Sequence, residues 1–238
     1  MPVGEFPPTH VSAVLALRSD DPLERRRSLE RILAGYDKPV YKHLRLKWRR
    51  SPEEAEDLAQ EFFARAIERR IFAAYEPSRG RFRTFVRACL DNFVLTAEEA
   101  RGRLKRGGGF ELVSTDAQAA ERELALAEVV DPETVFDREW VRNVAGRSVA
   151  LLEQRLVALD KRRHFEVFRR YDLHDGADEP SYAKVAAELG LKVTDVTNYL
   201  HAARKELRVI VLDVLRELTA SEEEFRAEAR EVLGVDVP

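Results

Sequence analysis

The chain has 238 residues, of which 45% are hydrophobic and 35% are charged, and its formal net charge is −3. This composition allows one large or two small globular domains with a buried core. The single cysteine, Cys89, excludes an internal disulfide framework and suits a reducing compartment, so we expect a cytoplasmic protein. The chain has no run of about 18 apolar residues, and the opening MPVGEFPPTH lacks signal-peptide features, so neither a membrane span nor a membrane partner is expected.

The charge is unevenly distributed along the chain. From Arg79 to Arg106 there are eight basic and three acidic residues, whereas from Val209 to Pro238 there are three basic and eight acidic residues. Nucleic acid responds to the local field rather than to the sum of the charges. The net charge therefore does not exclude a nucleic-acid partner.

Most segments have apolar residues at the 3.6-residue spacing of amphipathic helices, and none alternates as a strand would. The sequence therefore predicts an all-α fold. Helix starts are marked by N-cap residues followed by proline or glutamate at Ser51, Asp131 and Ser221. In chain order, the expected helices are Pro22–Ala34, Lys38–Arg49, Pro52–Ile71, Phe82–Lys105, Pro132–Leu159, Arg162–Tyr171, two short helices within Ser181–Leu207, and Glu222–Leu233.

A glycine-rich, polar stretch after residue 105 marks the expected domain boundary. Gly107, Gly108 and Gly109 cannot continue a helix without a cost, and the residues after them have little periodicity. We therefore predict two helical domains joined by a flexible linker. The N-terminal domain is expected over 1–105, the linker over 106–131, the C-terminal domain over 132–217, and an acidic helical tail over 218–238.

The helix expected from Pro52 has an apolar side and an acidic side. Its inward side is expected to hold Ala55, Leu58, Phe62 and Ile67. The other side carries Glu53, Glu56, Asp57, Gln60, Glu61 and Arg65. Two interpretations remain open at this point: a solvated helix face, or a docking surface for a basic helix of another protein.

The block from Gly80 to Gly109 interleaves aromatic and cationic residues. This mixture suits single-stranded nucleic acid, because bases stack on rings while guanidinium groups follow the backbone. Phe82 and Phe93 lie at helical spacing and are expected in the core, so the basic residues and Asn92 are the better candidates for binding. The glycines do not form a P-loop, since no strand precedes them and no Lys-Ser/Thr pair comes after them.

The stretch SYAKVAAELGLKVTDVTNYLHAARKEL, Ser181 to Leu207, resembles two short helices joined by a turn at Gly190. The faces expected to be buried consist of Tyr182, Val185, Ala186, Leu189, Val193, Val196 and Leu200. The outward residues of the second helix can bond base edges and phosphates, which favours a helix-turn-helix that reads DNA. A plain antiparallel hairpin with a solvated face is the alternative.

The sequence shows no catalytic or metal-binding pattern. The five histidines lack metal-ligand spacing, Cys89 has no companion, and neither a Gly-x-Ser-x-Gly elbow nor a Walker motif is present. We read the stretch HDGAD, His174 to Asp178, as a polar loop before a helix. We therefore expect no enzymatic activity, no cofactor and no metal.

Taken in order, three motifs resemble those of bacterial RNA polymerase sigma factors, most closely the two-domain extracytoplasmic-function (ECF) type. They are the acidic helix AEDLAQEFFARA, the basic block GRFRTFVRACLDNF with LKRGGG, and the helix-turn-helix stretch. The N-terminal segment FPPTHVSAVLALRSDDPLERRRSLERILAGYDKPVYKHLR is similar to the opening of a subgroup of these proteins. The resemblance implies a promoter-specificity factor for transcription initiation, with core RNA polymerase and promoter DNA as partners and an anti-sigma factor or other protein as a possible regulator.

The resemblance also implies roles for individual residues. Docking on the polymerase falls to Asp57, Gln60, Glu61 and Arg65. Recognition and melting of the −10 element fall to Arg83, Arg87, Asn92, Arg101, Arg103, Lys105 and Arg106. Reading of the −35 element falls to Lys192, Thr194, Thr197, Asn198, His201, Arg204 and Lys205.

Some features depart from the family pattern. Glu98 and Glu99 stand where a more basic helix is expected, and Asp195 and Glu206 reduce the positive charge of the recognition helix. The acidic tail has two interpretations: a packing helix, or a regulatory element that competes with DNA for the basic surface or receives a partner. Two other functions stay open as alternatives, namely a stand-alone helix-turn-helix regulator and an interaction protein that binds only protein.

Overall fold

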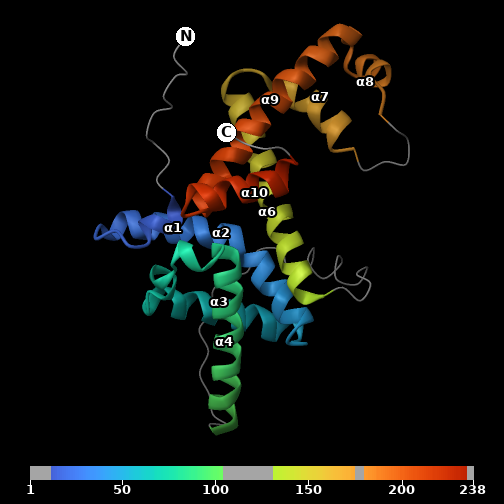
Figure 1. Cartoon of the computed structure of the whole chain (residues 1–238). Helices are drawn as coiled ribbons and strands as arrows, with labels where there is room; N and C mark the ends of the chain where they lie inside the picture. Colours follow the sequence, from blue (N-terminus) through green and yellow to red (C-terminus); the bar gives the residue numbers. More distant parts are fainter. Residues whose placement is uncertain (1–11, 104–130, 175–179, 235–238) are drawn as a thin grey trace. The chain divides into compact units, whose positions relative to one another are not determined.

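The computed structural model describes residues 12–103, 131–174 and 180–234, and all regular elements in these ranges are helical (Figure 1). The all-α prediction is thus confirmed. None of the described helices is long and apolar enough to cross a membrane. The elements are α1 (Ala13–Ala16), α2 (Pro22–Leu46), α3 (Pro52–Glu68), η1 (Ile71–Ala74), η2 (Pro77–Arg79), α4 (Phe82–Arg103), α6 (Pro132–Ala158), α7 (Arg162–Asp172), α8 (Tyr182–Leu189), α9 (Val193–Leu218) and α10 (Glu222–Leu233).

Helix α2 joins two stretches that the sequence predicts as separate helices, so the expected break between Ala34 and Lys38 is wrong. Pro39 lies inside α2 and has no N–H to donate to the carbonyl of Gly35. The side-chain amide of Asn143 donates to that carbonyl instead, at 3.2 Å, and to the carbonyl of Ala34 at 3.0 Å. Tertiary contacts thus satisfy the backbone groups that would otherwise end the helix.

The compact units of the structure are divided at other residues than the expected boundaries at 105, 131 and 217. Unit 1 comprises residues 1–143 and 215–238, and unit 2 comprises residues 144–214. The start of α6 and all of α10 therefore belong with the N-terminal helices. Their large apolar side chains are the reason: Phe136 and Trp140 on α6 and Phe225 on α10 are almost completely buried.

Unit 1 has an aromatic core. Tyr36 on α2 packs against Phe82, Phe136 and Trp140, with ring centroids 5.6, 6.5 and 6.5 Å away. Phe62 on α3 packs against Phe93 on α4, with centroids 5.7 Å apart. Phe82 and Phe93 of the basic block are thus core residues, as the structural interpretation of these side chains predicted.

Polar contacts around Asp91 join two helices of unit 1. Asp91 on α4 accepts hydrogen bonds from the indole of Trp48 (2.9 Å) and the ammonium of Lys47 (2.8 Å), and it also contacts His43 Nε2 (2.9 Å). These contacts hold the end of α2 against α4. The bonds from its partners lower the pKa of Asp91, although burial alone would raise it.

Unit 2 contains the rest of α6, together with α7, α8 and most of α9. Ser181 caps α8, and Gly190 ends it in the left-handed conformation (φ 63°), which glycine adopts without strain. As expected, Val185, Ala186, Val196 and Leu200 are buried. The expected burial of Tyr182 and Val193 is wrong, since these side chains are 37% and 47% exposed. Tyr182 instead stacks on Tyr171 of α7, with centroids 4.7 Å apart.

The buried ion pair of Lys42 and Glu139, with N and O 2.6 Å apart, predicts a large cost for removing one charge. We expect Glu139→Gln to lower the free energy of unfolding by about 3 kcal/mol, because the Lys42 ammonium loses the charge that compensates its desolvation. Urea denaturation measures this. The matched control is Glu30→Gln, which breaks the exposed pair with Arg26 and should cost less than about 0.5 kcal/mol. Equal costs would contradict a stabilising role for the buried pair.

Candidate functional site

The acidic face of α3 is presented to solvent. Asp57 and Glu61, one helical turn apart, lie on this face, where both are exposed, and Gln60 and Arg65 are partly exposed. Leu58 and Phe62 on the opposite side are buried. A capping box at Ser51 and Glu54 fixes the start of the helix. The four predicted docking residues therefore lie on one helix, which has the geometry of a protein-binding surface.

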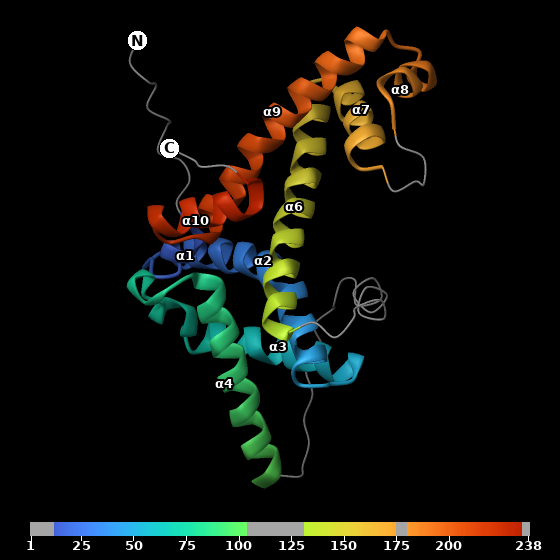
Figure 2. The same cartoon turned by 45° about the vertical axis from the view of Figure 1, so that its right-hand side comes forward.

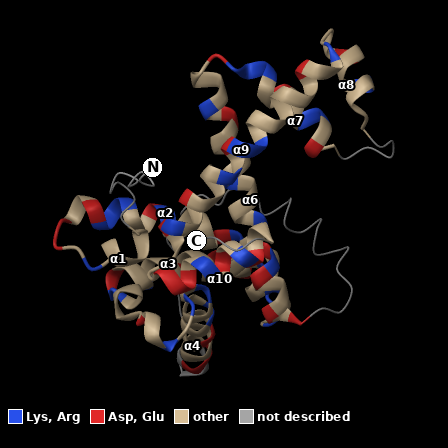
Figure 3. Ribbon diagram, turned by 45° about the horizontal axis from the view of Figure 1, so that its top comes forward, with Lys and Arg blue, Asp and Glu red and all other residues tan. Residues whose placement is uncertain are grey.

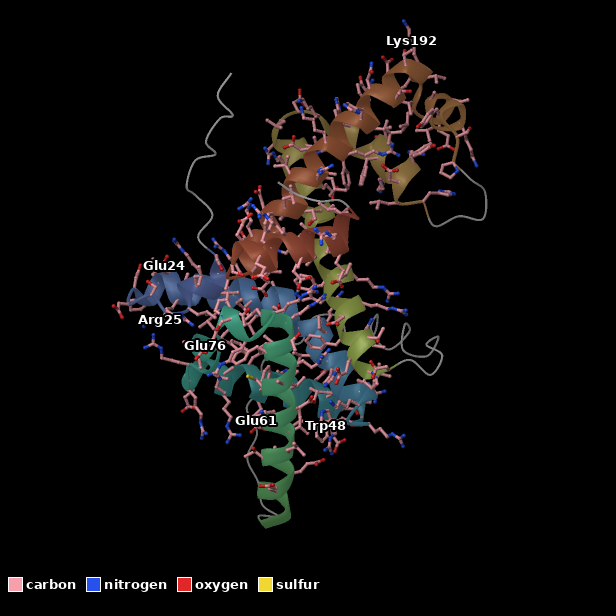
Figure 4. All side chains as sticks on the ribbon, viewed as in Figure 1. Glu24, Arg25, Trp48, Glu61, Glu76 and Lys192 are labelled. Atoms are coloured by element: carbon pink, nitrogen blue, oxygen red, sulfur yellow. The ribbon has the colours of Figure 1, made fainter. Side chains whose placement is uncertain are left out.

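The end of α3 differs from its acidic face in two respects. The guanidinium of Arg65 lies 5.6 Å from the ring centroid of Phe93 on α4, so one of the residues predicted to dock also packs against α4. Ile67, expected on the inward side, is 41% exposed, because it lies in the last turn before the helix ends at Glu68. Figure 4 labels Glu61 on this helix.

Arg83, predicted to contact the −10 element, is only 4% exposed. Its guanidinium lies 2.6 Å from a carboxylate oxygen of Glu231, 3.3 Å from Glu228 and 3.7 Å from Asp137. It also lies 5.1 Å from the ring centroid of Trp140. Burial lowers the pKa of Arg83, but the hydrogen bond to Glu231 and the charges of Glu228 and Asp137 raise it above its ordinary value.

The other residues predicted for the −10 element differ in their surroundings. Arg87 pairs with Glu133 (2.9 Å) and with Asp137 (3.7 Å), and its side chain is 14% exposed. Asn92, further along α4, is exposed. Arg101 and Arg103 belong to the last turn of α4, whereas Lys105 and Arg106 lie outside the described residues. The start of α4 therefore places its cations next to carboxylates of the same unit.

Glu224, which the sequence marks only as part of the helix start at Ser221, completes this cluster. One of its carboxylate oxygens accepts a hydrogen bond from the backbone N–H of Phe82, the first residue of α4, at 2.6 Å. The other accepts from Ala220 N–H (2.9 Å) and Tyr75 hydroxyl (3.2 Å). A carboxylate at this end complements the dipole of α4. Because Glu224 lies 142 residues from Phe82 in the chain, ordinary capping motifs could not reveal this cap.

Glu228 and Glu231 respond oppositely to this environment. Burial raises the pKa of Glu228 to about 7, although Arg83 and Arg81 partly oppose the shift. For Glu231, burial would raise the pKa, but hydrogen bonds from Arg83 and Arg81 lower it overall. Arg81 lies 2.7 Å from Glu231 and 3.6 Å from Glu228. The hydrogen bonds to Glu231 thus outweigh the cost of burying its charge, whereas the charges near Glu228 do not.

The residues predicted for the −35 element share one property in unit 2: all of them are exposed. Lys192 projects from the turn at the start of α9 (Figure 4). Its backbone N–H donates to the Asp195 carboxylate at 3.3 Å, so Asp195 helps to fix the start of the helix. The exposed set is Lys192, Thr194, Thr197, Asn198, His201, Arg204 and Lys205.

Arg204, in this set, is held by an ion pair within unit 2. Its guanidinium donates to both carboxylate oxygens of Asp172, at 2.6 and 2.9 Å, and lies 5.6 Å from the ring centroid of Tyr171. The hydrogen bond to Asp172 raises the pKa of Arg204 well above its ordinary value. Arg204 therefore also braces α9 against α7.

Among the described residues, no group of three or more His, Cys, Asp or Glu side chains could hold a metal ion. Burial raises the pKa of the Cys89 thiol to about 11, which keeps this cysteine in its unreactive form at neutral pH. The chemistry that these surfaces offer is binding, by charge and by hydrogen bonding.

The raised pKa of Glu228 predicts a pH effect on stability. The contribution of the Glu228 carboxyl group to the stability of the fold is fully present below its ordinary pKa. It is lost as the pH rises through about 7, because the folded state must then bury a charged carboxylate. Between about pH 5 and about pH 8 we expect the wild type to lose roughly 2 kcal/mol relative to Glu228→Gln. Urea denaturation across this range measures the difference, and parallel pH profiles would contradict it. Because the pKa of Glu231 is lowered, the contribution of its ion pairs to stability is lost only at more acidic pH, where its carboxylate becomes protonated.

One part of the chain is similar to a known protein family. Residues 34–103 match the model of the family described as Sigma-70 region 2. This segment includes α3 with its acidic face and α4 with its basic start. No curated protein and no solved structure matches the chain. The match supports a sigma factor of the sigma-70 family, which is not a family of enzymes, with a role in promoter recognition and RNA polymerase binding.

Proposed function

We propose that this chain is a cytoplasmic sigma factor of the ECF type, which directs core RNA polymerase to promoters with −35 and −10 elements and aids melting. The observation that carries the proposal is the match of residues 34–103 to sigma-70 region 2, because this segment holds both the acidic face and the basic block. The remaining parts of the proposal concern the role of each surface.

The α3 face is proposed to dock on the polymerase. Asp57 and Glu61 offer two carboxylates one turn apart, and Gln60 lies between them in the chain. A partner helix with basic side chains at the same spacing can pair with both carboxylates. The same face would suit an anti-sigma factor or other protein regulator, which would act by excluding the polymerase.

The α4 surface is proposed to bind the −10 element and the separated strand. Asn92 is exposed and its amide can bond an unstacked base, while Arg87 and the basic residues 101–106 suit phosphates. Melting needs no catalytic group, since capture of unstacked bases lowers the free energy of the open state relative to the closed state. Contact of Arg83 with phosphate requires exchange of its carboxylate partners for phosphate oxygens.

The exposed residues at the start of α9 are proposed to read the −35 element in the major groove. Asn198 carries an amide that suits base edges, while Lys205 suits a phosphate. The charge of this surface is modest because Asp195 and Glu206 lie on the same helix. A module tethered to a polymerase does not need tight binding alone, since the tether raises its effective concentration.

Transcription in vitro tests the function directly. We expect core RNA polymerase with this protein to produce start-site-specific transcripts from some members of a promoter-fragment library, and core enzyme alone to produce none. Absence of specific transcripts from every fragment would overturn the sigma proposal. Binding of duplex DNA without any effect on the polymerase would indicate a stand-alone regulator instead.

The docking role predicts that charge reversal on α3 abolishes polymerase binding. We expect Asp57→Arg with Glu61→Arg to weaken binding to core enzyme at least about 100-fold, since two pairs become repulsive. The matched control is Glu30→Arg with Glu76→Arg, which changes the net charge equally through exposed residues elsewhere in unit 1. Far-UV circular dichroism verifies the helices. Equal affinity of both variants for the polymerase would refute docking through α3.

A further inference from the structure

Helix α10 presents three carboxylates to the N-terminal end of α4. Glu224, Glu228 and Glu231 recur every three or four residues and therefore lie on one face of α10. Glu224 accepts from the first N–H of α4, and the other two contact Arg81 and Arg83. Figure 2 shows α10 beside α1 and α2, and Figure 3 shows the acidic residues along it. The cations at the start of α4 are therefore neutralised within unit 1.

Apolar contacts place α10 against this unit independently of the carboxylates. Phe225 and Ala229 are almost completely buried, and the guanidinium of Arg216 lies 4.1 Å from the ring centroid of Phe225. Ser221 caps the start of the helix, and Gly234 ends it in the left-handed conformation (φ 65°). The helix is thus a defined amphipathic element with its acidic groups held over α4.

The carboxylates occupy the groups that a phosphate backbone would use. The guanidinium of Arg83 donates to Glu231 at 2.6 Å, and that of Arg81 donates to the same carboxylate at 2.7 Å. Carboxylate and phosphate oxygens accept from guanidinium groups in the same way. The two anions cannot hold the same donors together, so binding of nucleic acid at Arg81 and Arg83 requires the carboxylates to leave.

The hydrogen bonding between α10 and Arg83 is incomplete, so separating them costs less free energy than breaking a fully satisfied buried ion pair. One nitrogen of Arg83, Nη1, and one oxygen of Glu228, Oε2, are buried without a hydrogen-bond partner. Buried charges gain stability only when their remaining donors and acceptors are satisfied. Glu228 is 1% exposed and lies 3.3 Å from Arg83, so it bears the cost of burial with limited compensation.

We propose that α10 is an acidic latch that occupies Arg81 and Arg83 in the free protein and restrains their binding to single-stranded nucleic acid. The proposal rests on the function proposed above, and it selects the regulatory interpretation of the acidic tail. Nucleic acid and the docked α10 compete for the same guanidinium groups, so weakening the latch shifts the population toward the binding-competent state.

Binding of a fluorescein-labelled, single-stranded DNA of mixed sequence to the full-length protein tests the latch. We expect Glu228→Gln with Glu231→Gln to raise the affinity about tenfold near 0.15 M salt and to steepen the dependence of log affinity on log salt by about 1.4, because two guanidinium groups gain phosphates. The matched control is Glu222→Gln with Glu223→Gln, which removes two exposed charges from the same helix and should leave both quantities unchanged.

Two additional variants keep the test decisive. Glu231→Gln alone alters a side chain that is 39% exposed, so the fold is retained, and we expect about a threefold gain because Glu228 remains in place. Adding Arg81→Gln and Arg83→Gln to the double variant should abolish the gain. Unchanged DNA binding in both the single and the double variant, or an equal gain in the control, would overturn the latch. Absence of transcripts with the wild-type protein would instead overturn the sigma function, so the two failures are distinguishable.

Discussion

The guanidinium of Arg83, on α4, is enclosed by groups from two other helices, α6 and α10, and the packing of unit 1 in the free protein depends on this enclosure. The group lies near the Trp140 ring and contacts carboxylates of Asp137, Glu228 and Glu231. A buried cation without partners costs several kcal/mol in a medium of low dielectric constant. In the free protein, carboxylates from the start of α6 and from α10 therefore compensate the burial of Arg83.

This requirement explains how a chain with 35% charged residues builds a compact unit. Charges inside unit 1 lie in pairs, such as Lys42 with Glu139 and Lys47 with Asp91. Each pair joins residues far apart in the chain. The same charges that predict a binding surface when counted along the sequence thus include several that hold helices together. Other charges, such as the carboxylates on the acidic face of α3, are exposed to solvent.

The two candidate DNA surfaces differ in how far their side chains are already paired within the protein. The residues at the start of α9 are exposed, and among them Arg204 is paired with Asp172. The cations at the start of α4 are neutralised by carboxylates of their own unit. If phosphates replace these carboxylates, each phosphate contact contributes less free energy of binding, because an ion pair within the protein is lost first.

Periodicity and capping residues alone determined the helical class, the acidic face of α3, the Ser181 and Ser221 caps, the turn at Gly190 and the exposed set at the start of α9. These features depend on residues within one or two helical turns, where sequence distance and spatial distance agree. Only the tertiary structure decided that α2 continues through Pro39, that Glu224 caps α4, and that Arg83 is buried. Each of these depends on a partner about 100 or more residues away in the chain, and no local pattern specifies which helix brings that partner into contact.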